Sequence, residues 1–205
     1  SIRRQRQMCI RDSYGIAQSL IRSGYMVYGQ DKNLLQQKKI VEEGGQVGEI
    51  SYGNLDAVII VVLNEAQTRE IIFGSDGIAA KLNKNTLVMV CTTVSPNFAK
   101  EMATLCENKE LLYLDAPISG GSKKSSEGKL SYMISGNKNA LDKAKPILEA
   151  TSETVFEFGE VVGAGSAMKA VNQMLAGVHI AAMAEAITFG ITQGCLLYTS
   201  DAADE

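Results

Sequence analysis

The sequence has little of what a metal site, a disulfide framework or a nucleic-acid interface requires. A single histidine, His179, and carboxylates scattered along the chain do not make a metal-ligand set. The four cysteines lack the spacing of metal motifs, and in a chain of 205 residues they indicate reduced thiols. The net charge of −3 provides no basic field for a phosphate backbone, so nucleic-acid binding is not expected.

Long apolar runs are missing as well. No uninterrupted apolar stretch reaches the roughly 18 residues that a membrane span needs, and no series of charged, apolar and small residues marks a signal peptide. We therefore expect a cytoplasmic protein without a membrane partner. The composition, 45% hydrophobic and 21% charged, is typical of a globular chain that buries a core.

The two ends of the chain have a common explanation in DNA. The segment 3–12, RRQRQMCIRD, is encoded by CGTCGGCAGCGTCAGATGTGTATAAGAGAC, and the opposite strand of the same DNA encodes CLLYTSDAAD, the segment 195–204. This DNA resembles a transposase-type sequencing-library adapter. We interpret residues 1–13 and 195–205 as adapter-derived and 14–194 as an open native fragment. The alternative is a basic N-terminal arm with a free acidic tail.

Strands and helices are expected to alternate between these ends. Apolar runs at 57–63 and 86–91 have the pattern of strands buried on both faces. Shorter strand candidates are 26–28, 111–114, 129–134 and 154–157, and helical spacing covers 15–22, 33–43, 67–73, 78–82, 96–105 and 140–150. The alternation predicts an α/β fold with a doubly wound parallel sheet over 14–162. An alanine-rich stretch at 166–193 predicts one long helix.

The predicted sheet begins with a helix, which is unusual for a dinucleotide-binding fold. In such folds the first helix follows a strand and a glycine-rich turn, whose N–H groups hold the pyrophosphate. Here the helix at Gly15 follows the adapter-derived segment. Asp31 ends the next predicted strand, where a carboxylate can accept hydrogen bonds from the adenosine ribose. An ordinary turn residue is the alternative for Asp31.

A glycine-rich motif follows the strand at 111–114. The segment 115–121, DAPISGG, joins the strand end to a loop in which Ser119, Gly120 and Gly121 offer a hydroxyl and backbone N–H groups. Such a loop suits an anion like a carboxylate, although an isolated Ser-Gly-Gly is usually a plain turn.

A polar cluster interrupts the apolar helix that follows. In the segment 163–173, GAGSAMKAVNQ, Asn172 and Gln173 lie three and four residues after Lys169. One helical face therefore presents an ammonium and two amides. A solvated stripe is the alternative interpretation, but a polar cluster within an apolar helix needs a reason.

Together the two motifs resemble the β-hydroxyacid dehydrogenase family, which includes 3-hydroxyisobutyrate and L-threonate dehydrogenases. The resemblance implies a Rossmann-type domain at 14–162, the first helix of an all-helical domain at 163–194, a nicotinamide cofactor, a small hydroxy-acid substrate and a homo-oligomer. It places the catalytic lysine at Lys169, the amide pair at Asn172 and Gln173, and the substrate carboxylate on the 119–121 loop. Gln173 and the segment 175–179 look more like the threonate branch.

The resemblance also assigns cofactor contacts. A family strand that ends in Leu-Pro corresponds to Leu63 and Asn64, so only a backbone contact carries over at Asn64. A family element near the nicotinamide ribose corresponds to Thr93. Asp31 would repel the 2′-phosphate of NADP, so NAD is the expected cofactor and NADP remains possible. The family's glycine-rich turn would end at Ser13, and we attribute its absence to truncation.

The implied chemistry is the removal of a hydride to the nicotinamide and of a proton from the substrate hydroxyl. Lys169 would accept that proton if its surroundings lower its pKa, and Asn172 would orient it. Two alternatives belong to other classes. One is a dinucleotide-binding module without catalysis, and the other is an interaction protein that uses the long helix at 166–193.

Overall fold

A computed structural model describes residues 2–31 and 33–195 of the chain, with only the backbone described for 2–11. The chain divides into two compact units, Ser1–Lys169 and Ala170–Glu205. Each unit is described by itself.

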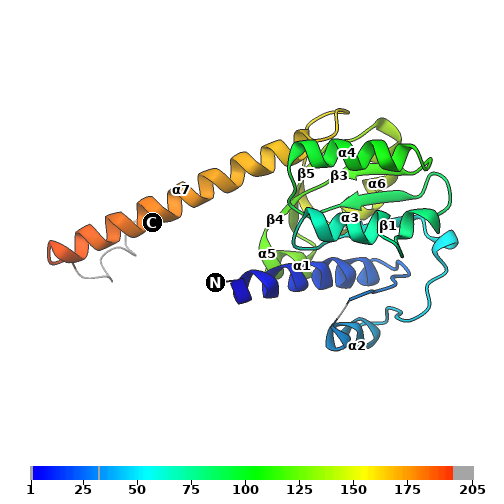
Figure 1. The fold of residues 1–205 in the computed structure, drawn as a ribbon. Coiled ribbons are helices and arrows are strands. Elements are labelled where there is room, and N and C mark those ends of the chain that lie inside the picture. The colour runs from blue at the N-terminus through cyan, green and yellow to red at the C-terminus, as the bar shows by residue number, and fades with distance from the viewer. Residues whose placement is uncertain (1, 32, 196–205) are drawn as a thin grey trace. The chain divides into compact units, whose positions relative to one another are not determined.

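The elements of the chain are shown in Figure 1. The helices are α1 Ile2–Arg22, α2 Leu34–Glu42, α3 Glu65–Phe73, α4 Pro96–Glu107, α5 Gly121–Glu127, α6 Lys138–Thr151 and α7 Ala164–Thr192, with short 3₁₀ turns at Tyr52–Asn54 and Ile78–Ala80. The strands are β1 Ala57–Ile60, β2 Leu87–Val90, β3 Leu112–Asp115, β4 Ile118–Ser119, β5 Leu130–Ile134 and β6 Ser152–Glu157.

A parallel sheet with helices on both faces forms the centre of the first unit. Its strand order is β1-β2-β3, and both strand pairs are parallel. Residues of β2 alternate between two cores: Met89 packs with α1 and α6 on one face, while Val88 and Val90 pack under α3 and α4 on the other (Figure 1). This period-two alternation follows from strand geometry and confirms the predicted α/β class.

Several helices begin where the sequence supplies a cap. Ser95 accepts a hydrogen bond from the N–H of Phe98, and Pro96 occupies the first turn of α4. Asn137 caps α6 in the same way through the N–H of Ala140. Polar caps of this kind satisfy N–H groups that have no partner inside the helix, so these starts could be predicted from the sequence.

The expected strand at 26–28 is wrong as an extended element. Only an isolated parallel bridge joins Tyr28 to Gln46. The run at 57–63 shortens to β1, most of which is only partly buried. Among the described residues β1 pairs with β2 alone. The expected helix at 78–82 is a 3₁₀ turn. The length of a strand follows the backbone pairs it forms, and the described residues pair only through Ile60 in β1 and through one bridge at Tyr28.

The later strands depart from the purely parallel expectation. β5 pairs in parallel with β6 but antiparallel with β4. The connection from β4 to β5 is too short for the usual parallel crossover, so the chain reverses direction there. An antiparallel bridge between Asp115 and Ser135 joins the end of β3 to the end of β5.

Helix α1 starts earlier than the sequence predicted. It runs from Ile2 instead of Gly15, through the segment interpreted as adapter-derived. Its described part packs closely on α5, since a Cβ added to Gly15 would lie 2.5 Å from the Ser125 Oγ atom. Ser19 donates a 3.0 Å hydrogen bond to the Ser125 carbonyl. Gly15 therefore allows the two helices to approach.

The predicted long helix is confirmed as α7, which has 29 residues. An 18-residue window of α7 has a mean hydropathy of 1.6 and at most two charged residues, which meets the length and composition of a membrane span. The expectation that the chain has no uninterrupted apolar run of about 18 residues holds, but it did not exclude a helix of this mean hydropathy. Polar residues interrupt the apolar sequence of α7, but the mean hydropathy of the window stays at 1.6. One helix that meets only the length and composition of a span is weak evidence for a membrane.

Candidate active site

A buried carboxylate at the end of β3 organises the start of α7. Asp115 is completely buried, and its carboxylate accepts four hydrogen bonds. Its Oδ2 atom accepts from the N–H groups of Gly163 at 3.2 Å and Ser166 at 2.9 Å, and from the Ser135 hydroxyl at 3.1 Å. Its Oδ1 atom accepts from the Ser166 hydroxyl at 2.6 Å. The first N–H groups of α7 are thus satisfied by an anion, which the helix dipole favours.

Ser135 completes this arrangement from the end of β5. Its hydroxyl oxygen accepts a 3.1 Å hydrogen bond from the N–H of Gly165 while its proton goes to Asp115. Burial raises the pKa of Asp115, and its bonds to Ser166, Ser135 and Gly163 oppose that rise. A buried carboxylate with this many donors is compensated for the loss of water.

Glycines let α7 start against the sheet and α4. A Cβ added to Gly165 would lie 2.3 Å from the Met133 carbonyl oxygen on β5. Gly163 has a φ of 97°, and a Cβ there would lie 2.8 Å from the Pro96 carbonyl oxygen. The glycines of the 163–173 motif therefore serve close backbone packing as well as conformation.

Lys169 lies one helical turn beyond Gly165. Only 7% of Lys169 is exposed, and burial lowers its pKa from the ordinary 10.5. Asp12 on α1 opposes this change by charge attraction, and burial raises the pKa of Asp12 itself. Because Asp12 belongs to the segment interpreted as adapter-derived, the lysine's own burial is the property of interest. A desolvated amine is easier to deprotonate, as a proton acceptor requires.

The amides predicted to accompany Lys169 lie further along α7. Asn172 and Gln173 are exposed and belong to the second unit, which begins at Ala170. His179 is exposed too. The roles assigned to Asn172 and Gln173 remain predictions from their spacing along the helix.

The predicted carboxylate loop is shorter than expected. Ser119 is paired with Ser131 as part of β4, and α5 begins already at Gly121. Gly120 has a φ of 130° and Gly121 a φ of 70°, values that only glycine adopts easily. The loop expectation is therefore wrong beyond Gly120, because the chain reverses within two residues and continues as a helix. The binding role of Ser119, Gly120 and Gly121 remains a prediction.

The residues predicted to face a nicotinamide cofactor follow β1 and β2. Val62 donates a 3.1 Å hydrogen bond from its N–H to the Thr92 Oγ1 atom, which ties the two strand ends together. Thr93 is exposed, and Leu63 is 37% exposed. Asn64 caps α3, so its side chain has a structural role. The carboxyl edge of a parallel sheet is where ligands of such folds bind.

Asp31 forms a local turn ahead of α2. Its Oδ1 atom accepts a 2.7 Å hydrogen bond from the N–H of Asn33, and its carbonyl accepts one from the Gln37 side chain. The turn interpretation of Asp31 is thus observed, while the ribose interpretation remains a prediction.

The fit of a dinucleotide is incomplete. Helix α1 is continuous from Ile2, so the N–H groups near Gly15 lie inside the helix instead of at a free N-terminus. In the part of the chain that the structure describes, the ribose and nicotinamide sides have candidate residues, but no glycine-rich turn precedes α1 to hold the pyrophosphate. The described residues therefore do not by themselves fit the whole group.

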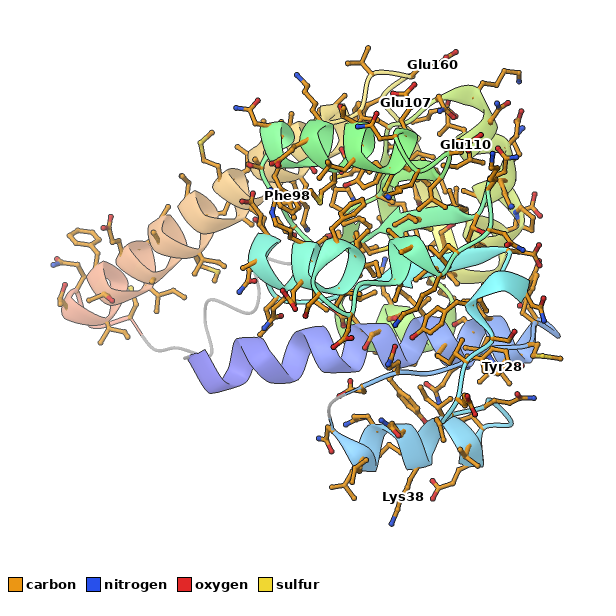
Figure 2. The ribbon with its side chains drawn as sticks, turned by 45° about the vertical axis from the view of Figure 1, so that its right-hand side comes forward. Tyr28, Lys38, Phe98, Glu107, Glu110 and Glu160 are labelled. Carbon is orange, nitrogen blue, oxygen red and sulfur yellow. The ribbon has the colours of Figure 1, made fainter. Side chains whose placement is uncertain are left out.

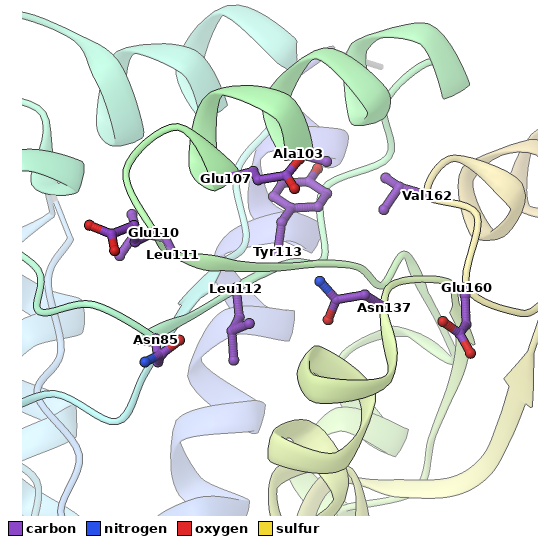
Figure 3. A pocket seen from close by; sticks show the side chains of 10 residues that line it. All are labelled: Asn85, Ala103, Glu107, Glu110, Leu111, Leu112, Tyr113, Asn137, Glu160 and Val162. Carbon is purple, nitrogen blue, oxygen red and sulfur yellow. The ribbon is translucent and has the colours of Figure 1, made fainter.

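A surface pocket of about 520 Å³ lies elsewhere in the first unit (Figure 3). Its lining residues are Asn85, Ala103, Glu107, Glu110, Leu111, Leu112, Tyr113, Asn137, Glu160 and Val162. Glu107, Glu110 and Glu160 lie on one side of the unit in Figure 2. Asn85 and Leu111 precede β2 and β3, at the opposite edge from the predicted cofactor contacts. The pocket contains none of the predicted site residues and is not the candidate site.

Comparison with known proteins decides the family. The family described as the NAD binding domain of 6-phosphogluconate dehydrogenase matches residues 14–159. The chain belongs to this NAD-binding family. An L-threonate dehydrogenase from Haemophilus influenzae is 40% identical over 184 residues, which are 88% of this chain and 61% of that protein. A 3-hydroxyisobutyrate dehydrogenase from Pseudomonas aeruginosa is 31% identical over 182 residues, 87% of this chain and 61% of that protein.

Two solved structures support the same fold. The 3-hydroxyisobutyrate dehydrogenase of Salmonella typhimurium has a TM-score of 0.86 and 36% identity, and the match covers 93% of this chain and 67% of that one. The corresponding enzyme of Mycobacterium tuberculosis, solved with L-serine, has a TM-score of 0.83 and 27% identity, with 91% and 64% covered. The resemblance and the Rossmann-type fold are confirmed. The chain spans about 61% of the length of the curated relatives just named.

Sequence reasoning missed the part played by Asp115, Ser135 and Ser166. In the sequence, Asp115 is only the first residue of the DAPISGG motif. A charged residue at the end of an apolar strand is itself a signal, because it must be paired if it is buried. The sequence does not reveal its partners, because Ser135 and Ser166 lie 20 and 51 positions away along the chain.

Proposed function

We propose that this chain is part of a longer oxidoreductase that transfers a hydride reversibly between a small 3-hydroxy or 2,3-dihydroxy carboxylic acid and NAD, with NADP as a possible substitute. Membership of the NAD-binding family and similarity to hydroxyacid dehydrogenases support the proposal. The observation that carries it is Lys169, a buried lysine with a lowered pKa on an anchored helix start. The nicotinamide, when bound, would supply the hydride acceptor.

Lys169 would handle the proton. In the oxidative direction its neutral amine accepts the proton of the substrate hydroxyl, and in the reductive direction the ammonium returns it. Burial lowers the lysine pKa, so a larger fraction of Lys169 is neutral near physiological pH than for an exposed lysine. Arginine could not replace it, because a guanidinium stays protonated.

The substrate's carboxylate would bind at Ser119, Gly120 and Gly121. Ser119 lies in β4, which is paired with β5, and α7 packs on β5 through Gly165. Both predicted elements are therefore held by one strand, which supports a fixed separation between carboxylate and proton acceptor. Asn172 and Gln173 would complete the polar surroundings of the substrate hydroxyl.

The native segment and the full-length protein are also part of the proposed function. We infer that 14–194 is the native segment, which the family match starting at residue 14 supports. The full-length protein would be a cytoplasmic homo-oligomer. The printed chain would lack dehydrogenase activity, because the turn for the pyrophosphate is missing from its described part. Calorimetric titration of the printed chain with NAD should show no saturable binding.

The central test is Lys169→Ala in the full-length protein, assayed with NAD and either L-threonate or 3-hydroxyisobutyrate. We expect kcat to fall about 100-fold or more, with cofactor affinity unchanged within a few-fold. Lys169→Arg should be as inactive as Lys169→Ala, while Lys109→Ala, at an exposed lysine, should match the unsubstituted protein. Turnover within a few-fold of normal in Lys169→Ala would reject the proposal.

A further inference from the structure

The start of α7, which belongs to the first unit, is held by a small set of contacts. Among the described residues of α7, the buried ones are Gly165, Ser166 and Lys169. They lie at positions i, i+1 and i+4, so they share the buried side of the helix over its first turn and a half. Two of the three, Gly165 and Ser166, are tied by their N–H groups to the buried side chains of Ser135 and Asp115.

Asp115 is the centre of these contacts. Its carboxylate accepts from one hydroxyl and two N–H groups at Oδ2 and from the Ser166 hydroxyl at Oδ1. Four donors that converge on two oxygens require a group that only accepts, which is what an ionised carboxylate provides. The 2.6 Å contact to Ser166 is in the range of a charge-assisted bond.

We propose that Asp115 is a positioning residue for Lys169: by fixing the N–H groups of Gly163 and Ser166 it sets the place and burial of the lysine one turn further along α7. The proposal rests on the proposed role of Lys169 as the proton acceptor. Asp115 acts here through the backbone of α7 and does not touch the reacting groups.

A direct electrostatic action of Asp115 on the lysine is the competing explanation. Asp12 is the charge that raises the pKa of Lys169, whereas Asp115 acts by charge on Tyr113 and Cys91, both buried. The two explanations predict opposite changes. If the carboxylate held the ammonium by charge, its removal would lower the lysine pKa. If it holds the helix start, its removal exposes Lys169 and raises that pKa.

The test compares Asp115→Ala and Asp115→Asn with the unsubstituted full-length protein, using the pH profile of kcat for hydroxy-acid oxidation. Asp115→Ala removes every acceptor, so we expect the apparent pKa of the rising limb to move up by about one unit and kcat at pH 7.5 to fall about 10-fold. Asparagine retains an acceptor for the two N–H groups and can donate to the Ser166 hydroxyl. Asp115→Asn should therefore keep most of kcat at pH 7.5 and leave the apparent pKa close to that of the unsubstituted protein.

A matched control separates positioning from general destabilisation. Asn137→Ala removes the side-chain cap of α6, a helix start of similar kind that does not carry Lys169. It should lower the melting temperature without moving the pH profile. If Asp115→Ala fails to fold, Ser166→Ala, which leaves Asp115 with three donors, should shift the profile in the same direction by a smaller amount. An unshifted or lowered apparent pKa in whichever variant folds would overturn the proposal.

A second readout does not depend on catalysis. Peptide mass spectrometry can follow the rate at which an amine-reactive reagent modifies Lys169. This rate reports the burial and the protonation of the lysine. Asp115→Ala should increase the labelling of Lys169 at pH 10.5 several-fold, and Asn137→Ala should not. Normal turnover in Lys169→Ala would reject the proton role, yet this measurement would still decide whether Asp115 holds the lysine. Equal labelling in Asp115→Ala and the unsubstituted protein would overturn the positioning proposal alone.

Discussion

Gly165→Ala is the sharpest single test of how α7 meets the sheet. The added Cβ would lie 2.3 Å from the Met133 carbonyl oxygen, 3.1 Å from its carbon and 3.2 Å from the Asp115 Oδ2 atom. Both partners are confined, because the oxygen belongs to the backbone of β5 and the carboxylate is held by four donors. The methyl group therefore cannot be accommodated by the rotation of a flexible side chain.

The size of the effect follows from this overlap. The contact is about 1 Å closer than ordinary van der Waals contact, so the first turn of α7 must move away from β5. Overpacking of this kind costs about 3 kcal/mol, at the upper end of the usual range. The favourable helix propensity of alanine offsets less than about 1 kcal/mol. A net loss of about 2 kcal/mol should lower the melting temperature by roughly 4–8 °C in a protein of this size.

Gly177→Ala supplies the matched control on the same helix. A Cβ at Gly177 meets nothing within 4 Å, so only the propensity gain applies and stability should rise by about 0.5–1 kcal/mol. Thermal unfolding of this 205-residue chain, followed by circular dichroism, would compare the two variants. If Gly165→Ala were neutral or stabilising like Gly177→Ala, the described contact between α7 and β5 would be wrong.

Three further predictions concern titration, thiol reactivity and cofactor choice. In the folded protein the pKa of Lys169 lies below its ordinary value of 10.5. Between these two pKa values the folded protein binds fewer protons than the unfolded protein, so the free energy of unfolding should rise with pH in that range. Denaturant unfolding should therefore show Lys169→Met more stable than the unsubstituted protein at neutral pH, with a difference that shrinks toward pH 10.5; a constant difference would contradict the lowered pKa. Burial raises the pKa of Cys106 to about 12 and also raises that of Cys91, so thiol reagents should modify both only after unfolding, as peptide mass spectrometry can show. Asp31→Asn should reduce the preference for NAD over NADP about 10-fold in kcat/KM, and an unchanged ratio would leave Asp31 with its turn role alone.

The sequence was sufficient for the features that depend on local patterns. The apolar run at 86–91 predicted the strand β2, which is buried on both faces as such a run indicates, and 111–114 was a shorter candidate that became β3. Helical spacing at 96–105, 140–150 and 33–43 predicted α4, α6 and α2, and the structure shows that Ser95, Asn137 and Asn33 cap their starts. The segments DAPISGG and GAGSAMKAVNQ pointed to the family because their glycines, hydroxyl and lysine are spaced as its motifs are. These signals lie within a few residues of one another.

Tertiary structure decided what depends on partners far apart in the chain. It reduced 26–28 to one bridge and left β1 half-buried, since strand length follows from neighbours that a sequence pattern does not reveal. It turned the end of the expected loop into α5. It also made Asp115 the buried anchor of a helix that begins about 50 residues later, through Gly163 and Ser166. Lys169 could be named from its motif, but its burial, and hence its lowered pKa, exists only because the folded chain removes it from water.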